Sequence, residues 1–260
     1  MSVAESRVGT RVTDTGVQLF GFTIGHVNMP MSFFIDGEEG VVRAPVTAFL
    51  IDHPKGLALF DTGLGPRFER PVGAALESFI DLEAGGTMDV RLRGIGVDPA
   101  DVRWIIASHL HADHSGGNSA FPNATIIIQE SELDYAKDHS DGMLYSIEEF
   151  ETGQPFLKLK GDHDLFDDGT VVIFPTPGHT PGHQSARVRT PQGEVVLTGD
   201  CCAMKRSLDE FKLPDHCHDA DQFLGSLQLL RSLESKGAHV FPSHDPVFWA
   251  GIPMERPIIL

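Results

Sequence analysis

The chain has 260 residues, enough for one large domain, and its 41% hydrophobic and 22% charged content is ordinary for a soluble globular protein. Lys and Arg number 20 against 37 Asp and Glu, so the net charge is −17. Such an acidic surface repels the phosphates of nucleic acids and of anionic lipids. We therefore expect neither nucleic acid nor a membrane as a partner, and no apolar run approaches the ~20 residues that span a bilayer.

The cysteines and the first residues bear on the compartment. The opening stretch MSVAESRVGTRVTDTG lacks the apolar segment of a secretory signal. Cys201, Cys202 and Cys217 are an odd number, and two are adjacent, so a disulfide framework is not expected. These features predict a reduced, cytoplasmic location. The adjacent pair is expected to pack as small buried hydrophobic residues rather than to act as nucleophiles.

Short runs of Val, Ile, Leu and Phe between turn residues predict a series of strands. In chain order they are Val17–Thr23, Val46–Asp52, Leu57–Phe60, Trp104–Ala107, Thr125–Gln129, Thr170–Pro175, Ser185–Arg189, Val195–Leu197 and Ala238–Phe241. Apolar residues at helical spacing predict helices over Glu130–Asp138 and Asp221–Lys236, the second ended by Gly237. Strands interleaved with a few helices predict two sheets with helices outside, in a single domain over residues 1–260.

Two stretches look too irregular for the core. Residues 64–93 carry scattered Gly and Pro, and residues 137–166 are rich in Asp, Glu and His. Long irregular connections in a compact domain usually have a functional role. We predict that both are loop insertions that form walls of a pocket.

The densest signal is the motif HLHADHSGG, which begins at His109. It follows the predicted strand Trp104–Ala107, and in extended chain His109 and His111 point the same way because side chains alternate. A turn into a helix near Asp113 and His114 directs these two at a neighbouring point. A lone HxH pair is usually coincidence and a lone Asp is an ordinary helix N-cap, so the motif needs support elsewhere.

Three later positions supply that support. His179, in TPGHTPGH, follows a predicted strand within a turn rich in Pro and Gly. Asp200 ends the run LTGD, and His244 lies in FPSHD after another apolar run. Strand ends gather at one edge of a sheet, so these polar residues are expected to meet. Imidazole and carboxylate groups brought together in this way predict a metal site.

In combination, the HxHxDH motif, a later His, a later Asp and a final His resemble the metallo-β-lactamase superfamily, from about Val17 to Asp245. The resemblance implies an α/β fold, the αβ/βα four-layer sandwich, with a dinuclear metal site at one edge of the paired sheets. The ligands that it implies are His109, His111 and His179 for one metal, Asp113, His114 and His244 for the other, and Asp200 as a bridge. The DTG motif implies that Asp61 hydrogen-bonds a ligand histidine. His183 is expected to support the site without being a ligand.

The implied chemistry is metal-dependent hydrolysis. Nitrogen and carboxylate ligands suit two zinc ions, and iron, manganese or cobalt also fit such a set. A hydroxide held between two metals, where the pKa of water falls to about 7, is predicted to attack a carbonyl carbon. Asp113 is predicted to serve both as a ligand and as the catalytic group that orients this hydroxide and passes a proton to the leaving group.

Among hydrolases of this superfamily, the motifs HLHADHSGG and HTPGHQS look most like those of the quorum-quenching N-acyl-homoserine lactonases. Glyoxalase II thioesterases usually carry an extra helical domain with basic residues, whereas the tail after His244 offers only Arg256. We therefore expect a lactonase that acts on small lactones or esters. A thioesterase or another carboxylic-ester hydrolase is the alternative.

One position departs from the lactonase pattern. Well-known lactonases carry a Tyr three residues after the bridging Asp, and here that residue is Ala203. Either the metals alone stabilise the oxyanion, or another donor such as His216 or His218 takes the place of the Tyr. The stretch DHCHD that holds both histidines is expected to be a solvated loop at the mouth of the pocket.

An apolar cluster near the N-terminus is open to two interpretations. It consists of Phe20, Phe22, Met29, Met31, Phe33 and Phe34. The cluster fits a hydrophobic core. The non-periodic stretch from Met29 to Phe34 fits equally well a groove for an acyl chain or the surface of a homodimer.

Overall fold

The computed structural model describes residues 15–69, 79–82, 85–140 and 143–260. Its strands are β1 (Gln18–Pro30), β2 (Val41–His53), β3 (Gly56–Phe60), β4 (Ile80–Asp81), β5 (Val102–Ile106), β6 (Thr125–Gln129), β7 (Phe156–Leu159), β8 (His163–Asp164), β9 (Val171–Pro175), β10 (Gln184–Thr190), β11 (Gly193–Leu197) and β12 (His239–Phe241). Its α-helices are α2 (Met88–Gly94), α3 (Ala112–Ser115), α4 (Glu130–Asp138), α5 (Ile147–Phe150), α6 (Lys205–Glu210), α7 (Ala220–Ser235) and α8 (Pro246–Trp249).

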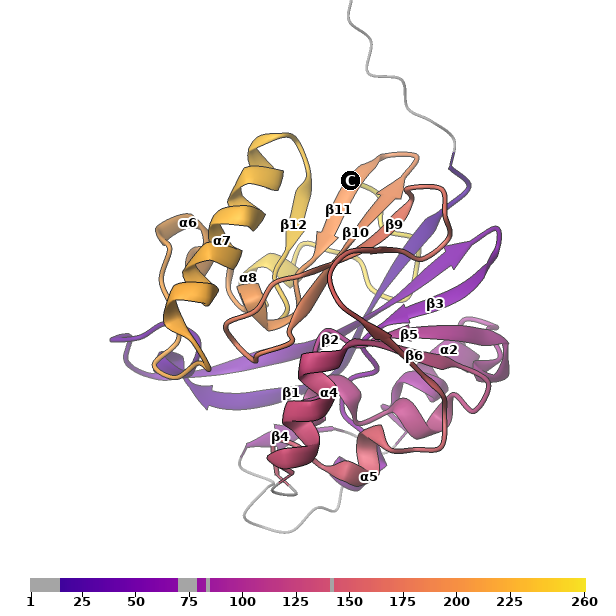
Figure 1. Ribbon diagram of the computed structural model, residues 1–260, viewed down its shortest axis with the longest axis horizontal. Coiled ribbons are helices and arrows are strands. Elements are labelled where there is room, and N and C mark those ends of the chain that lie inside the picture. Colours follow the sequence, from indigo (N-terminus) through magenta and orange to yellow (C-terminus); the bar gives the residue numbers. More distant parts are fainter. Residues whose placement is uncertain (1–14, 70–78, 83–84, 141–142) are drawn as a thin grey trace, which may run out of the picture.

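The strands form two sheets that pack against each other (Figure 1). One sheet has the order β4-β1-β2-β3-β5-β6-β7, and the other has the order β12-β11-β10-β9-β8. The pairs β1–β2 and β2–β3 are antiparallel, whereas β3, β5, β6 and β7 run parallel. In the second sheet only β11 and β12 are parallel.

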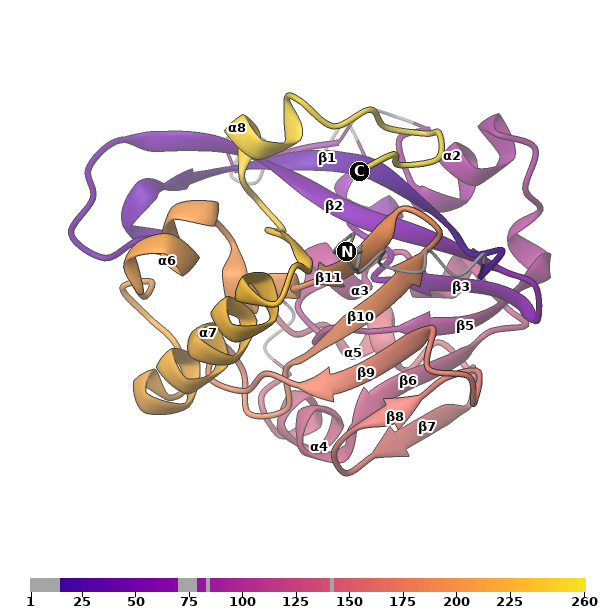
Figure 2. The same cartoon turned by 90° about the horizontal axis from the view of Figure 1, so that it is seen from above.

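The alternation of side chains along the strands explains the layers. In β6, Ile127 packs between the two sheets, whereas Ile126 and Ile128 belong to the cluster that also contains Leu133 of α4. On the far side, Phe223 of α7 and its apolar neighbours cover the outer face of the second sheet. Figure 2 shows α6 and α7 on that side and α4 beyond the opposite sheet. The result is helix, sheet, sheet, helix, which confirms the predicted four-layer α/β sandwich.

The predicted strands and both predicted helices are present, with ends shifted by a few residues in most cases. The main error concerns β1, which was expected to end at Thr23 and continues to Pro30. A register shift between Thr23 and His26 breaks the alternation, and Gly25 there has a φ of +87°. A bulge of this kind hides the second half of a strand from a period-two pattern.

The two stretches expected to be irregular contain regular elements as well. Residues 64–93 include β4 and the start of α2, although residues 70–78 and 83–84 lie outside the described part. Residues 137–166 include α5, β7 and β8. The sequence pattern missed these because each is short. Among the described residues, no helix is both long and apolar enough to cross a membrane.

Candidate metal centre

The predicted ligands meet where several strands of the two sheets end. His109 and His111 follow β5, and His179 lies in the turn from β9 to β10. Asp200 lies in a 3-10 turn over Gly199–Cys202 after β11, and His244 follows β12. All of these segments leave the sheets at one edge, as the sequence predicted.

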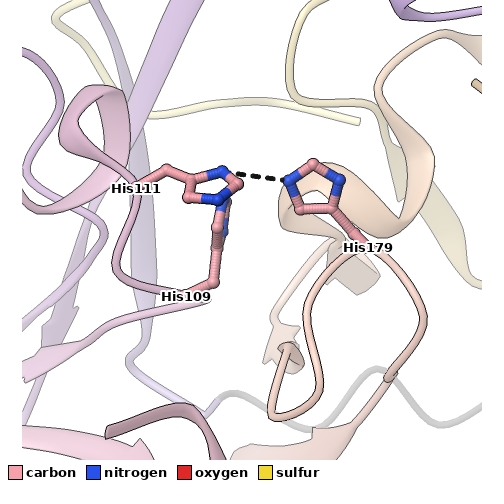
Figure 3. A group of neighbouring side chains, drawn as sticks. All are labelled: His109, His111 and His179. Carbon is pink, nitrogen blue, oxygen red and sulfur yellow. Dashed lines mark hydrogen bonds between the residues drawn. The ribbon is translucent and has the colours of Figure 1, made fainter. Parts of the chain in front are cut away.

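Three histidines form the first group (Figure 3). Nδ1 of His111 lies 3.2 Å from Nε2 of His179, and the ring of His109 lies 4.5 Å from that of His111 and 4.8 Å from that of His179 between centroids. The ligand atoms of the three side chains lie within 4.8 Å of one another. Nε2 of His109 is buried and has no hydrogen-bond partner among the described residues.

The second group consists of Asp113, His114 and His244. Oδ2 of Asp113 lies 3.6 Å from Nε2 of His114 and 3.6 Å from Nε2 of His244. The short helix α3 carries Asp113 and His114, and its N-cap residue is His111. The predicted turn from extended chain into a helix is thus present, and it separates the two groups.

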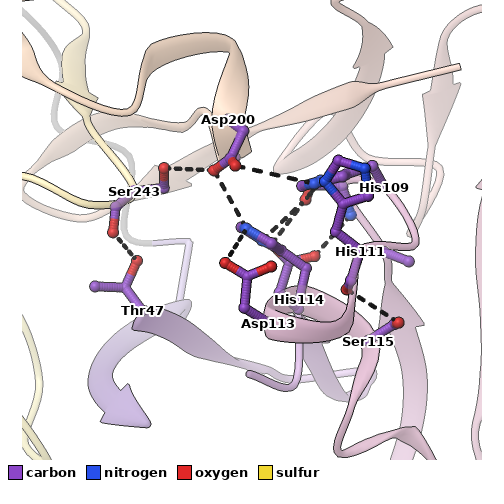
Figure 4. Close-up of polar contacts among 12 residues, drawn as sticks. Thr47, His109, His111, Asp113, His114, Ser115, Asp200 and Ser243 are labelled. Atoms are coloured by element: carbon purple, nitrogen blue, oxygen red, sulfur yellow. Dashed lines mark hydrogen bonds and ion pairs between the residues drawn. The ribbon is translucent and has the colours of Figure 1, made fainter. Parts of the chain in front are cut away.

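Asp200 lies between the two groups (Figure 4). Its Oδ2 faces the first group, 4.0 Å from Nε2 of His109 and 3.5 Å from Nε2 of His179. Its Oδ1 faces the second, 3.2 Å from Nε2 of His114 and 3.1 Å from Nε2 of His244. The hydroxyl of Ser243 donates a hydrogen bond to Oδ1 at 2.8 Å. This carboxylate therefore presents one oxygen to each group.

Three of the histidines are held in place by hydrogen bonds of their Nδ1 atoms, which leave Nε2 for the site. Nδ1 of His114 donates to Asp61 at 2.8 Å, and Nδ1 of His244 donates to the Pro45 carbonyl at 2.8 Å. The Ser108 hydroxyl donates to Asp61, so it accepts from Nδ1 of His109 at 3.0 Å. Each ring is thereby held with Nε2 turned into the site, an arrangement that orients metal ligands. Asp61 makes the predicted hydrogen bond to a histidine of the cluster, and its backbone has a left-handed φ of +58° that Asp tolerates.

The electrostatics of the cluster favour neutral histidines in the first group. Burial, together with neighbouring histidines, lowers the pKa of His109 and of His111 well below the usual value. In the second group burial acts in the same direction, but Asp200 and Asp113 outweigh it and raise the pKa of His114 well above that value. Burial likewise opposes ionisation of Asp200, yet His114 and His244 hold its pKa well below the usual range. A carboxylate among several imidazoles is a donor set that a divalent cation satisfies.

Backbone contact between two loops supports the site. A Cβ atom on Gly65 would lie 2.0 Å from the carbonyl oxygen of Gly116, and one on Gly116 would lie 2.4 Å from the amide nitrogen of Gly65. The loop after Asp61 therefore packs directly on the loop after His114, and only glycine fits at this contact.

These observations test whether the residues fit the implied metal ions. Five histidines and two aspartates converge. The Nε2 atom of His109 is buried and has no hydrogen-bond partner in the described part of the chain, which is costly unless a ligand satisfies it. Imidazole nitrogens and carboxylate oxygens in tight groups suit zinc and related transition metals. The side chains fit a pair of metal ions, one in each group.

Other predicted residues lie close to the centre. His183 is buried, its ring lies 5.2 Å from that of His109, and its Nδ1 pairs with the Thr176 hydroxyl at 2.9 Å. Burial lowers its pKa to about 3. Cys201 and Cys202 are buried in an apolar cluster, which confirms that the pair packs as small hydrophobic residues.

The position of the missing Tyr is close to the centre as well. Ala203 accepts a hydrogen bond from the backbone amide of His244 at 2.9 Å and borders a cavity of about 20 Å³ that Asp200 also lines. His216 and His218 are both exposed. The ring of His216 packs on Phe33 with 4.1 Å between ring centroids, and neither histidine is among the described residues that line the cavity of about 290 Å³ above the cluster. A donor role for either remains a prediction.

A larger cavity of about 290 Å³ opens onto the ligands. Its polar floor includes His111, Asp113, His179, Asp200 and His244. Its walls are mainly apolar and consist of Val27, Met29, Phe33, Phe34, Leu64, Phe68, Phe79, Ile80, Ala112, Met143 and Leu144, with Arg67 as a charged member. Both predicted insertions contribute to this lining, which confirms them as pocket walls.

The apolar cluster near the N-terminus was expected to form either core or a groove, and its two halves differ in this respect. Phe22 is buried in the core, with Phe20 packed against it, whereas Met29, Phe33 and Phe34 line the cavity. Met31 packs beside these three. The groove interpretation therefore fits the second half of the cluster, and a homodimer surface stays a prediction.

Glu132, a fully buried carboxylate in α4, contacts the loops that carry His109, His111 and His179 and was not predicted from the sequence. A signal for it existed, because Glu132 lies on the same helix face as the buried Leu133 and Ala136. A charged residue on an apolar face needs partners, and here those partners belong to the site.

Comparison with known proteins agrees with this geometry. The model of the metallo-beta-lactamase superfamily matches residues 41–235. N-acyl homoserine lactonase AttM of Azorhizobium caulinodans is 36% identical, with 82% of this chain and 86% of that protein covered. N-acyl homoserine lactonase AiiA of Bacillus thuringiensis subsp. kurstaki is 32% identical, with 79% and 83% covered.

A solved structure extends the likeness to three dimensions. It is an N-acyl homoserine lactone hydrolase with the product N-hexanoyl-L-homoserine bound at its catalytic metal centre. The two share 27% sequence identity and a TM-score of 0.82, over 93% of this chain and 98% of the other. The family model spans most of the chain, and the matches cover more than four fifths of each of the two relatives. The chain therefore belongs to the metallo-beta-lactamase superfamily.

Proposed function

We propose that this protein is a dinuclear metal-dependent lactonase that opens the ring of N-acyl homoserine lactones. The observation that carries the proposal is the cavity of about 290 Å³, which has the ligand cluster as its floor and apolar side chains as its walls. A substrate with a reactive ester at one end and an aliphatic acyl chain at the other matches both parts. The names of the curated relatives support this substrate class.

In this proposal His109, His111 and His179 hold one metal, and Asp113, His114 and His244 hold the other. Asp200 would contribute to both sites, because its Oδ2 faces the first group and its Oδ1 faces the second. Zinc is the proposed metal because the donors are imidazoles and carboxylates, and iron, manganese and cobalt are the other ions that this set accepts.

The chemistry that a pair of divalent ions supplies in such a site is an activated water and a polarised carbonyl group. The protein itself must place the lactone carbonyl at the cavity floor and manage the proton. Asp113 is the proposed proton carrier, since its carboxylate lines the cavity and is 24% exposed, more than that of Asp200 at 12%. Water adds across the ester C–O bond: its oxygen bonds to the carbonyl carbon as the ring C–O bond breaks, Asp113 takes up a proton of this water and passes it to the departing alkoxide, and the product is a hydroxy acid.

A direct test measures hydrolysis by the metal-loaded protein over a panel of substrates in a pH-stat, since ring opening releases acid. We expect N-acyl homoserine lactones to be opened with a kcat/KM at least tenfold above that for thioesters of the same acyl length. The His111→Ala variant serves as the control and should lose at least a hundredfold of the activity. Preferred thioester turnover, or equal rates for wild type and variant, would overturn the proposal.

A further inference from the structure

A buried carboxylate outside the ligand set joins the chain segments that carry the first histidine group. Glu132 lies in the first turn of α4 and is fully buried. Its Oε1 accepts hydrogen bonds from the backbone amide of Leu110 at 3.1 Å and from the Tyr145 hydroxyl at 3.2 Å. Its Oε2 accepts from the Thr180 hydroxyl at 2.6 Å and from the amide of Gly182 at 3.2 Å.

The donors connect Glu132 to all three histidines of that group. Leu110 lies between His109 and His111 in the sequence, and Thr180 directly follows His179. Tyr145 packs its ring edge-on against the ring of His111, with 4.7 Å between centroids. Thus one carboxylate fixes two loops that leave different sheets, β5 of one and β9 of the other.

Backbone packing adds to this connection. A Cβ atom on Gly182 would lie 2.2 Å from the amide nitrogen of Glu132, so the loop after His179 lies directly against the start of α4. A longer side chain at Gly182 would push this loop away, and Glu132 would then lose its two Oε2 partners.

The charge of Glu132 indicates what the arrangement serves. Its carboxylate accepts four hydrogen bonds from the described residues, and none of the Lys and Arg side chains among these residues forms an ion pair with it. A buried anion without a cationic partner is costly. A cation held by His109, His111 and His179 would lie next to the segments that Glu132 binds and would compensate its charge.

We propose that Glu132 is a positioning residue for the first metal, which sets the spacing of His109, His111 and His179 and thereby the affinity of that site. The inference rests on the metal centre under Proposed function. Glu132 makes no contact with Asp113, His114 or His244 in the described structure, so the second metal is expected to depend on it far less.

The test is a Zn²⁺ titration of the metal-free full-length protein in competition with a chromophoric chelator. Glu132→Gln keeps the volume but turns an amide NH2 toward two donors. We expect one of the two zinc equivalents to bind 10- to 100-fold more weakly, the range typical for groups that orient metal ligands, and the other to change less than threefold. Thr180→Val removes one of the four hydrogen bonds and should weaken the same equivalent by a smaller factor.

A purely structural role predicts a different result. The matched control is Gln154→Met, because Gln154 is buried, donates to the carbonyls of Asn118 and Phe121, and has no contact with His109, His111 or His179 in the described structure. This variant should lower Tm equally with and without Zn²⁺, whereas Glu132→Gln should lower it more in the loaded protein.

Two outcomes would overturn the inference. One is an unchanged zinc affinity in Glu132→Gln. If that variant does not fold, the other is an unchanged zinc affinity in Thr180→Val. A wild-type protein that binds no zinc would instead contradict the proposed function.

Discussion

The carboxylate of Asp61 accepts a hydrogen bond from Nδ1 of His114 at 2.8 Å, and the same carboxylate accepts from the amide and the hydroxyl of Ser108. Burial raises the pKa of Asp61, and these hydrogen bonds oppose that rise. The contact leaves Nε2 of His114 directed at Asp200 and Asp113. Asp61, which directly follows β3, thus orients a proposed ligand of the second metal.

Asp61→Asn tests this relationship without straining the backbone, because Asn also adopts the left-handed conformation of residue 61. The amide NH2 of the variant takes the place of a carboxylate oxygen that accepted a hydrogen bond, so that two donors face each other. We expect the affinity for one zinc equivalent to fall by about 10- to 100-fold, measured by chelator competition. An affinity equal to that of wild type would show that Asp61 does not orient His114.

Asp113→Asn separates the proposed ligand role of this residue from its proton transfer. The variant should lower kcat for lactones by about 10²-fold or more, because an amide cannot carry the proton to an alkoxide. An aryl ester, which has a leaving group that needs no proton, should suffer a clearly smaller loss. Parallel metal analysis gives the occupancy of each sample. Equal losses for both substrates at full occupancy would contradict proton transfer by Asp113.

The apolar rim of the cavity should set the preference for acyl length. Leu144 lines the cavity and is 45% exposed, and Leu229, on α7, is 42% exposed and does not line it. Leu144→Asp is expected to raise KM for a ten-carbon acyl chain about tenfold and KM for a four-carbon chain much less, because only the long chain buries surface there. Leu229→Asp is the matched control and should leave both values unchanged. A similar rise for both chain lengths would refute this assignment.

Glu149 should make stability depend on pH. Burial raises the pKa of its carboxyl to about 7, although its 2.7 Å ion pair with Arg67 opposes the shift. Since the folded chain holds this proton more tightly than the unfolded chain, the stabilisation is complete below the ordinary pKa of 4.5 and is lost as the pH rises to about 7.

The measurement is urea unfolding of metal-free wild type and of Glu149→Gln across this range. The free energy of unfolding of wild type minus that of the variant should fall by on the order of 2 kcal/mol between pH 4.5 and pH 7. A difference that does not change with pH would show that Glu149 titrates normally.

The sequence predicted for a physical reason that these histidines and aspartates meet. His109, His179, Asp200 and His244 each follow an apolar run, and strand ends in a layered sheet protein converge on one edge. Polar residues at such strand ends can therefore be recognised in the sequence from their type and position alone. The core strands were equally visible, because burial imposes a regular apolar pattern on them.

What the sequence could not predict depends on distant contacts. The bulge at Gly25 hides the second half of β1, including Met29, which lines the cavity. The Pro45 carbonyl that orients His244 is a backbone atom and carries no signature in the residue type. In the sequence, Glu132 looks like any acidic residue in the first turn of a helix. Its partners Leu110 and Thr180 lie far from it in the sequence and contact it only in the folded chain.

The central claim is that two metal ions held by this cluster open a lactone ring. The most direct measurement adds Zn²⁺ in steps to metal-free protein while the opening of an N-acyl homoserine lactone is followed at constant pH. We predict that the rate is negligible without metal, rises with added zinc and reaches a plateau at two equivalents per chain. Full activity without metal, or no ring opening at two bound equivalents, would contradict the account.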